Sequence, residues 1–188
     1  VNRLEPVFGY QPVVCNHRRT LRQKKGIAMD TLFTPWRMEY IRSSKKDGCI
    51  FCEMLERDDR DALIVRRGRH AFLVLNRYPY NNGHYMSVPY RHVDSLENLT
   101  ADETAEMMAL LAQGIAALRK AWHPEGFNIG ANIGQVAGAG VKDHVHMHVV
   151  PRWAGDTNFM PLFADTRVIP QTLEETYDEL KAALDRLP

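Results

Sequence analysis

Apolar and polar residues alternate along the chain between about residues 64 and 88. Such short runs, bounded here by RRGR and by the turn-forming stretch RYPYNNG, are typical of strands with one buried face. The pattern predicts three strands, at Ile64–Val65, Ala71–Asn76 and His84–Val88. Because their connections are short, we expect these strands to form a meander.

Two later segments repeat apolar residues at helical spacing. The first follows Thr100 and the second follows Thr172, and a glutamate three residues later completes a capping box in each case (Glu103 and Glu175). We interpret both stripes as core rather than as a cofactor site. They consist of Met107, Leu111, Ile115, Leu118 and Trp122, and of Leu173, Tyr177, Leu180 and Leu184.

Between these helices the chain returns to strand-like alternation. Residues 127–133 (FNIGANI) alternate, a glycine-rich loop follows, and the stretch DHVHMHVVPRW then places His144, His146 and His148 at every second position. In an extended strand these three imidazoles share one face. The sum predicts an α+β fold, an antiparallel sheet with a long helix and a C-terminal helix packed on it.

Composition describes an ordinary globular chain. Of 188 residues, 45% are apolar and 25% are charged, and the formal net charge is +1, so nothing indicates a specific nucleic acid as partner. No apolar run approaches the roughly 20 residues that cross a bilayer. Three cysteines are too few for a disulfide framework. We therefore expect a cytoplasmic protein with no membrane partner.

The first 28 residues differ from the rest. They contain six basic residues and one acidic residue, with no periodicity, and a segment beginning at Met29 then resembles an ordinary protein start. We expect residues 1–28 to be a disordered or non-native basic extension rather than a nucleic-acid-binding arm, and residues 29–188 to form one domain.

Three aligned histidines admit several interpretations. They can occur by chance, they can bind a catalytic zinc ion, or one of them can attack phosphorus as a nucleophile. The preceding loop favours phosphate chemistry, because Gly134, Gly138 and Gly140 let its backbone approach an anion closely. The loop matches neither the Walker A nor the GxGxxG pattern.

These motifs together resemble the histidine triad (HIT) family. The matching stretches are HVHMHVV, NIGxxxG ahead of it, LNxYPxxxGHxxxVPxxH upstream and PRWAGD downstream. The opening TPWRMEYI is similar to the diadenosine polyphosphate phosphorylase-like branch of bacteria, which is close to the fragile histidine triad hydrolases. The resemblance implies a HIT-like fold and a single catalytic domain.

The resemblance also implies roles for individual residues. His146 would be the nucleophile, with His148 at the phosphate oxygens or leaving group and His144 completing the triad. Asn76 would bind the ribose hydroxyls, while His84 is either a supporting residue or merely structural. The phosphates would contact Asn132, Gln135, Gly138, Ala139 and Gly140. Gly140 offers no side-chain donor, so the leaving group would need backbone amides, Lys142 or water; Arg152 and Trp153 either close over the phosphates or simply pack.

Cys49 and Cys52 form a C-x-x-C motif. Two reduced buried thiols or a redox pair would explain it, but some HIT proteins combine such a pair with two histidines. The resemblance places His92 and His144 beside these cysteines, which would complete a structural Zn²⁺ site with four protein ligands.

We therefore expect an enzyme that transfers a nucleotidyl group from dinucleoside polyphosphates through a covalent histidine intermediate. Water as second substrate would give hydrolysis, and orthophosphate would give phosphorolysis. Alternatives are a purine nucleoside phosphoramidase, a nucleotide-binding regulatory protein with weak catalysis, and a three-histidine metallohydrolase. The family commonly forms homodimers, and we expect one here.

Overall fold

The sheet has five antiparallel strands in the order β1-β2-β3-β5-β4. The computed structural model describes residues 48–156 and 169–188, so the basic segment 1–28 lies outside the described residues and the boundary at residue 29 stays a prediction. The α+β prediction is confirmed. The strands are β1 (Ile64–Arg67), β2 (Ala71–Leu75), β3 (Tyr85–Pro89), β4 (Gly126–Gly130) and β5 (Met147–Arg152).

Both long helices begin at the predicted capping boxes. In each box the threonine hydroxyl accepts from the amide of the glutamate three residues later, and that glutamate accepts from the threonine amide. None of the described helices combines the length and apolar character needed to cross a membrane. The helices are α2 (Ile50–Met54), α3 (Asp59–Ala62), α4 (Ala101–Trp122) and α6 (Leu173–Asp185), with short 3-10 turns at Leu96–Asn98 and Gln135–Ala137.

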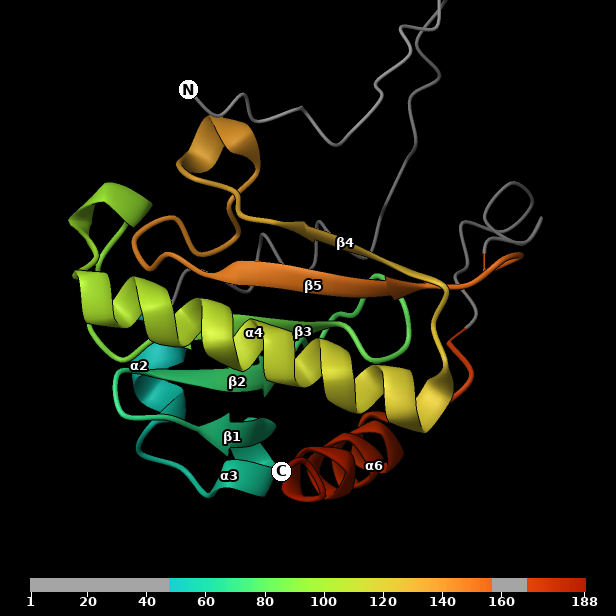
Figure 1. Ribbon diagram of the computed structural model, residues 1–188. Helices are drawn as coiled ribbons and strands as arrows, with labels where there is room; N and C mark the ends of the chain where they lie inside the picture. The colour runs from blue at the N-terminus through green and yellow to red at the C-terminus, as the bar shows by residue number, and fades with distance from the viewer. Residues whose placement is uncertain (1–47, 157–168) are drawn as a thin grey trace, which may run out of the picture. The chain divides into compact units, whose positions relative to one another are not determined.

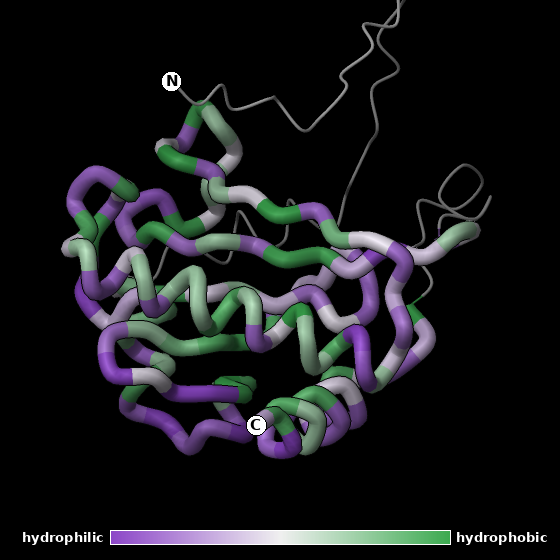
Figure 2. Tube along the Cα trace, viewed as in Figure 1, coloured by the Kyte–Doolittle hydropathy of each residue, from purple (hydrophilic) through white to green (hydrophobic). Residues whose placement is uncertain are grey.

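Helices α4 and α6 pack on one face of the sheet (Figure 1). The Tyr85 hydroxyl donates to the Leu111 carbonyl (2.7 Å) and the Ser87 hydroxyl to the Met107 carbonyl (3.0 Å), which ties β3 to α4. Gly114 makes this close approach possible, because a Cβ there would lie 2.5 Å from the Tyr85 ring. In Figure 2, β2 is mostly hydrophobic, as expected of a strand buried along its whole length.

The opposite face of the sheet carries the histidines. Side chains alternate along β3, so His84 and Met86 point away from α4. Met86 is paired with His148 on β5, and directly paired residues of antiparallel strands share a face. Helix α2 lies behind β2 in Figure 1, on this same face. Phe51 of α2 contacts His144 and His146.

The histidine strand is shorter than predicted. Strand β5 begins at Met147, so His144 and His146 lie in the segment that leads into it. Continued pairing would place Val145 opposite Pro89, which has no N–H to donate; the Val145 amide bonds instead to the Val93 carbonyl (2.6 Å). Strand β4 also ends at Gly130, which is paired with His148, rather than at residue 133. Continued pairing would place Asn132 opposite His146, which lies outside β5.

Candidate functional site

Three histidines, His144, His146 and His148, form what we call the histidine row. The first two are buried, with 0% and 4% of their surface exposed, and His148 is half-buried. The ring centroids of His146 and His148 are 4.8 Å apart. The middle and last rings are therefore adjacent, although β5 begins only at Met147.

The hydrogen bond of His146 fixes its tautomer. Its Nδ1–H donates to the His144 carbonyl (2.9 Å), because a carbonyl oxygen can only accept. Nε2 then carries the lone pair, and it has no hydrogen-bond partner within the described residues. Burial lowers the pKa of this ring, so that it is neutral near pH 7. His146 thus presents an unprotonated nitrogen.

The tautomer of His148 is fixed from one side by a short chain of hydrogen bonds. The Tyr80 amide donates to Nδ1 of His84 (3.0 Å), so a neutral His84 carries its proton on Nε2. That Nε2 lies 3.0 Å from Nδ1 of His148 and donates to it. A neutral His148 therefore carries its own proton on Nε2 and donates from that nitrogen.

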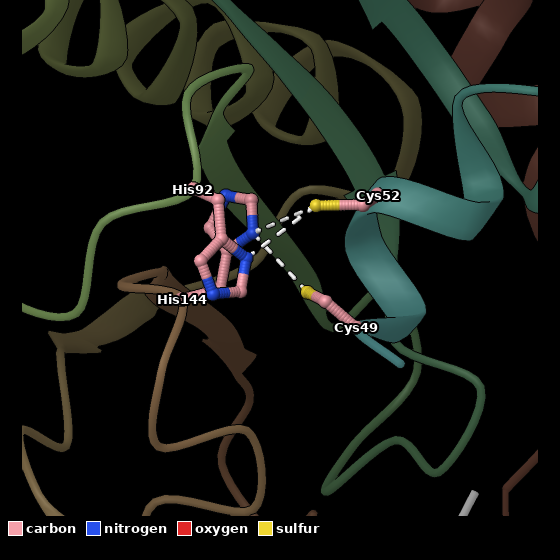
Figure 3. Close-up of side chains that lie close together, drawn as sticks. All are labelled: Cys49, Cys52, His92 and His144. Atoms are coloured by element: carbon pink, nitrogen blue, oxygen red, sulfur yellow. Dashed lines mark hydrogen bonds between the residues drawn. The ribbon is translucent and has the colours of Figure 1, made fainter. Parts of the chain in front are cut away.

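Two cysteines and two histidines come together beside His146, and we call them the Cys/His cluster (Cys49, Cys52, His92 and His144; Figure 3). Their four candidate ligand atoms all lie within 4.8 Å of one another. The Cys49 Sγ atom is 3.3 Å from Nδ1 of His144, and the Cys52 Sγ atom is 3.5 Å from Nδ1 of His92.

The geometry and chemistry of the Cys/His cluster fit a zinc ion. Bonds of about 2.0–2.3 Å in a tetrahedron separate ligand atoms by roughly 3.3–3.8 Å. Three of the four sulfur–nitrogen distances are 3.3, 3.5 and 3.8 Å, and all ligand atoms lie within 4.8 Å of one another. Nε2 of His144 donates to the Pro89 carbonyl (2.9 Å), so the Nδ1 lone pair faces the sulfurs. Burial and the neighbouring Cys49 thiol raise the pKa of Cys52, which disfavours its thiolate form. A bound cation would stabilise that thiolate.

Asn76 lies at the His148 end of the row. Its Nδ2 is 3.4 Å from Nδ1 of His84, and its Oδ1 accepts from the Tyr78 amide (2.9 Å). A cavity of about 210 Å³ adjoins Asn76 and His84 and extends to the start of α6, but the residues of the histidine row do not line it. The structure thus brings Asn76 near His148, and the cavity is not the reacting centre.

The glycine-rich loop (residues 132–140) is folded back on itself. The Gly138 amide donates to the Gln135 carbonyl (3.0 Å) and the Ala139 amide to the Gly134 carbonyl (3.4 Å), so these amides do not point outward in this conformation. The Gly140 amide has no hydrogen-bond partner within the described residues. Asn132 donates to the Gly138 carbonyl (3.4 Å), and no hydrogen bond links Asn132 or Gln135 to the histidine row in the described part of the chain.

Three residues near the row have structural partners. Lys142 pairs with Asp143 at 3.8 Å, with both side chains exposed. Arg152 forms a bidentate ion pair with Asp156, and the Trp153 indole donates to the Trp122 carbonyl (3.1 Å). Arg152 and Trp153 therefore each have a partner within the protein, and the role of either at the phosphates stays a prediction.

Two contacts of the row were not foreseen from the sequence. Tyr80 stacks on His84, with ring centroids 4.8 Å apart, and its amide sets the tautomer of that ring. Phe51 contacts both His144 and His146. The only sequence signal for Phe51 was its position inside the C-x-x-C motif, where just one of the two intervening residues can face inward.

Comparison with known proteins agrees with this geometry. The HIT domain family model matches residues 57–155. A protein of Mycobacterium tuberculosis named AP-4-A phosphorylase is 41% identical over 169 residues, which cover 85% of this chain and 87% of that protein. A zinc-bound histidine triad family protein of Mycobacterium smegmatis superposes with a TM-score of 0.59 at 29% identity, covering 74% of this chain and 94% of the other. The chain belongs to the HIT domain family.

Proposed function

We propose that this protein is a nucleotide-processing enzyme that acts on dinucleoside polyphosphates, as the name of its mycobacterial relative indicates for that protein. The observation that carries the proposal is the pair of tautomers in the histidine row. His146 offers a lone pair on Nε2, and His148 beside it offers a proton on Nε2. A nucleophile next to a hydrogen-bond donor for the leaving oxygen suits displacement at phosphorus.

The reaction then takes two steps. Nε2 of His146 attacks the α-phosphorus, a P–N bond forms, and the P–O bond to the polyphosphate breaks. The polyphosphate leaves as an anion, and Nε2–H of His148 donates a hydrogen bond to the leaving oxygen. In the second step an oxygen of orthophosphate, or of water that releases a proton to solvent, bonds to phosphorus and the P–N bond to His146 breaks. Because the relative is a phosphorylase by name, we favour orthophosphate, with hydrolysis as the alternative outcome.

Substrate contacts follow from the positions around the row. Asn76 is placed beside His84 and His148, and its amide can donate to and accept from ribose hydroxyls. The Gly140 amide, together with Asn132 and Gln135, would hold the phosphates. Gly138 and Ala139 would take part only if the loop opens, since their amides are bonded within it.

Zinc is proposed in the Cys/His cluster, held by Cys49, Cys52, His92 and His144. The ion would cross-link α2 to the segment before β5 and so stabilise the fold around His146. The geometry supports a structural role, because four protein ligands leave no open position for substrate.

A homodimer is proposed on the exposed edge of the sheet. Strand β4 pairs with β5 on one side, and no other described strand pairs with its outer edge. Ile129 and Ile133 are 47% and 42% exposed there. A second copy of the chain would cover both the open edge and these side chains.

The decisive experiment supplies diadenosine tetraphosphate with and without orthophosphate. We expect ADP and ATP when phosphate is present, and an acid-labile adenylyl group on His146 when it is absent. His146→Ala should abolish turnover and labelling. His123→Asn is the control, because His123 is exposed at the C-terminal end of α4 with φ 50°, a conformation that asparagine tolerates.

Other products would redirect the assignment. AMP and ATP without added phosphate would establish hydrolysis, and much faster turnover of P–N substrates would establish a phosphoramidase. Nucleotide binding without turnover would indicate a regulatory protein. Full activity of His146→Ala would overturn the proposal, and chelator-sensitive activity in that variant would indicate a metallohydrolase.

A further inference from the structure

The C-x-x-C helix α2 does more than present two cysteines. The two residues between the cysteines face opposite ways, because Ile50 is 40% exposed and Phe51 only 1% exposed. Phe51 therefore points from α2 toward the histidine row, and it belongs to the main buried cluster of the protein.

The Phe51 ring touches two members of the row at once. Its centroid lies 5.0 Å from that of His146, with the planes inclined by 53°, and 5.4 Å from that of His144, inclined by 73°. Both distances fall within the roughly 4.5–7 Å range of favourable aromatic pairs. The same ring thus contacts a ligand of the Cys/His cluster and the neighbouring nucleophile.

The orientation of the His146 ring depends on such packing, because hydrogen bonding restrains its rotation only weakly. Within the described residues its side chain makes one hydrogen bond, from Nδ1 to the His144 carbonyl. A single bond fixes the tautomer but does not fully fix the rotation of the ring. Among the described residues, the His146 ring contacts the rings of Phe51 and His148, with centroids 5.0 and 4.8 Å away.

We propose that Phe51 is a positioning residue for His146, which holds the imidazole so that its Nε2 lone pair faces the substrate. This inference rests on the proposed role of His146 as nucleophile. It also gives the C-x-x-C motif a second task, since the helix anchored by the two cysteines carries the ring that aims the nucleophile. A displacement of about 1 Å at a reacting atom can cost about 10²-fold in rate.

The test compares Phe51→Leu with Ile50→Leu, the same replacement at the adjacent exposed position of α2. In Phe51→Leu we expect the single-turnover rate of His146 adenylylation to fall at least about tenfold, while KM stays within about twofold. Ile50→Leu should match the wild type in both. Zinc content and thermal unfolding are measured on each variant, and Phe51→Met, which keeps a long apolar side chain, replaces Phe51→Leu if the latter does not fold.

A second measurement separates positioning from general stability and does not require turnover. In ¹⁵N NMR spectra the wild-type His146 ring should be a single Nδ1–H tautomer. In Phe51→Leu, rotation of the loosened ring should break the Nδ1–H bond to the His144 carbonyl part of the time and so give a mixture of the two tautomers. Equal adenylylation rates and an unchanged tautomer in the leucine and methionine variants would overturn the inference. If instead the wild type never forms the adenylyl adduct, the proposed function fails, and the tautomer measurement still decides whether Phe51 positions the ring.

Discussion

His144 and His148 lie at opposite ends of the histidine row, and the two imidazoles differ in burial and in hydrogen-bond partners. His144 is fully buried, donates to a backbone carbonyl and turns its other nitrogen to two sulfurs. His148 is half-buried, and its Nδ1 receives a proton from another imidazole, His84. The first end is fixed by main chain and thiols, and the second by a side chain.

The difference teaches how one short motif can serve two purposes. A ring held by a carbonyl on one nitrogen and by sulfurs on the other has no proton to exchange with a substrate. A ring whose Nδ1 only accepts, as in His148, keeps its remaining proton on Nε2. We therefore expect the His144 end to govern stability and the His148 end to govern rate.

Replacing His148 should have the largest effect and should leave the other end intact. We expect His148→Ala to reduce kcat by between about 10²- and 10³-fold, the range for loss of one hydrogen-bond donor to developing charge, with unchanged zinc content. Steady-state kinetics and metal analysis of the purified variant measure both. A loss smaller than about fivefold would contradict the division of roles.

Removing the metal should act on stability. At a thousand-fold excess over its Kd a bound ion stabilises the native state by about 4 kcal/mol, which corresponds to about 10 °C for a protein of this size. We expect a chelator to lower Tm by about that amount in the wild type and to have no effect on Cys52→Ser. Cys15→Ser, which changes the cysteine outside the C-x-x-C motif, serves as control and should behave like the wild type. Equal Tm values with and without chelator in the wild type would refute the zinc assignment.

A smaller effect should come from the ion pair next to His92. Arg91 donates to Glu103, and this interaction, with the capping bonds from Thr100, lowers the pKa of Glu103 to about 2. Because the folded-state pKa is depressed, its stabilisation is present above pH 4.5 and is lost as the pH falls toward 2. We expect Glu103→Gln to cost about 1 kcal/mol at neutral pH, with the difference from wild type narrowing below pH 4.5.

Urea unfolding across this pH range measures the difference. Glu175→Gln is the matched control, since Glu175 forms the same capping box in α6 but is exposed and has no arginine partner among the described residues. It should destabilise less than Glu103→Gln. A Glu103→Gln penalty that is the same at pH 7 and pH 3 would show that the ion pair contributes nothing.

Local signals predicted the elements of the fold well. The capping boxes at Thr100 and Thr172 set the helix starts because they involve only neighbouring residues. The end of β4 and the start of β5 could not be read in this way. The start of β5 depends on Pro89, whose missing N–H matters only once β3 and the histidine segment lie side by side, and the end of β4 depends on where its neighbour β5 begins.

The candidate site was predictable to a similar degree. Resemblance placed the four residues of the Cys/His cluster together, and the structure brings them together. It gave no indication that the amides of Gly138 and Ala139 close a turn within their own loop. Nor could it show that Tyr80 and Phe51 contact the row, because these contacts join segments distant in sequence.

The pairing of β5 on both edges has a consequence for folding. Strands β3 and β4 flank it and fix its register through Met86↔His148 and Ile129↔Val149. A slip by a single residue would turn His148 toward the hydrophobic core and Val149 toward the opposite face of the sheet. Misregistered molecules would therefore lose the contact between His146 and His148 and would expose an apolar side chain that the native register buries.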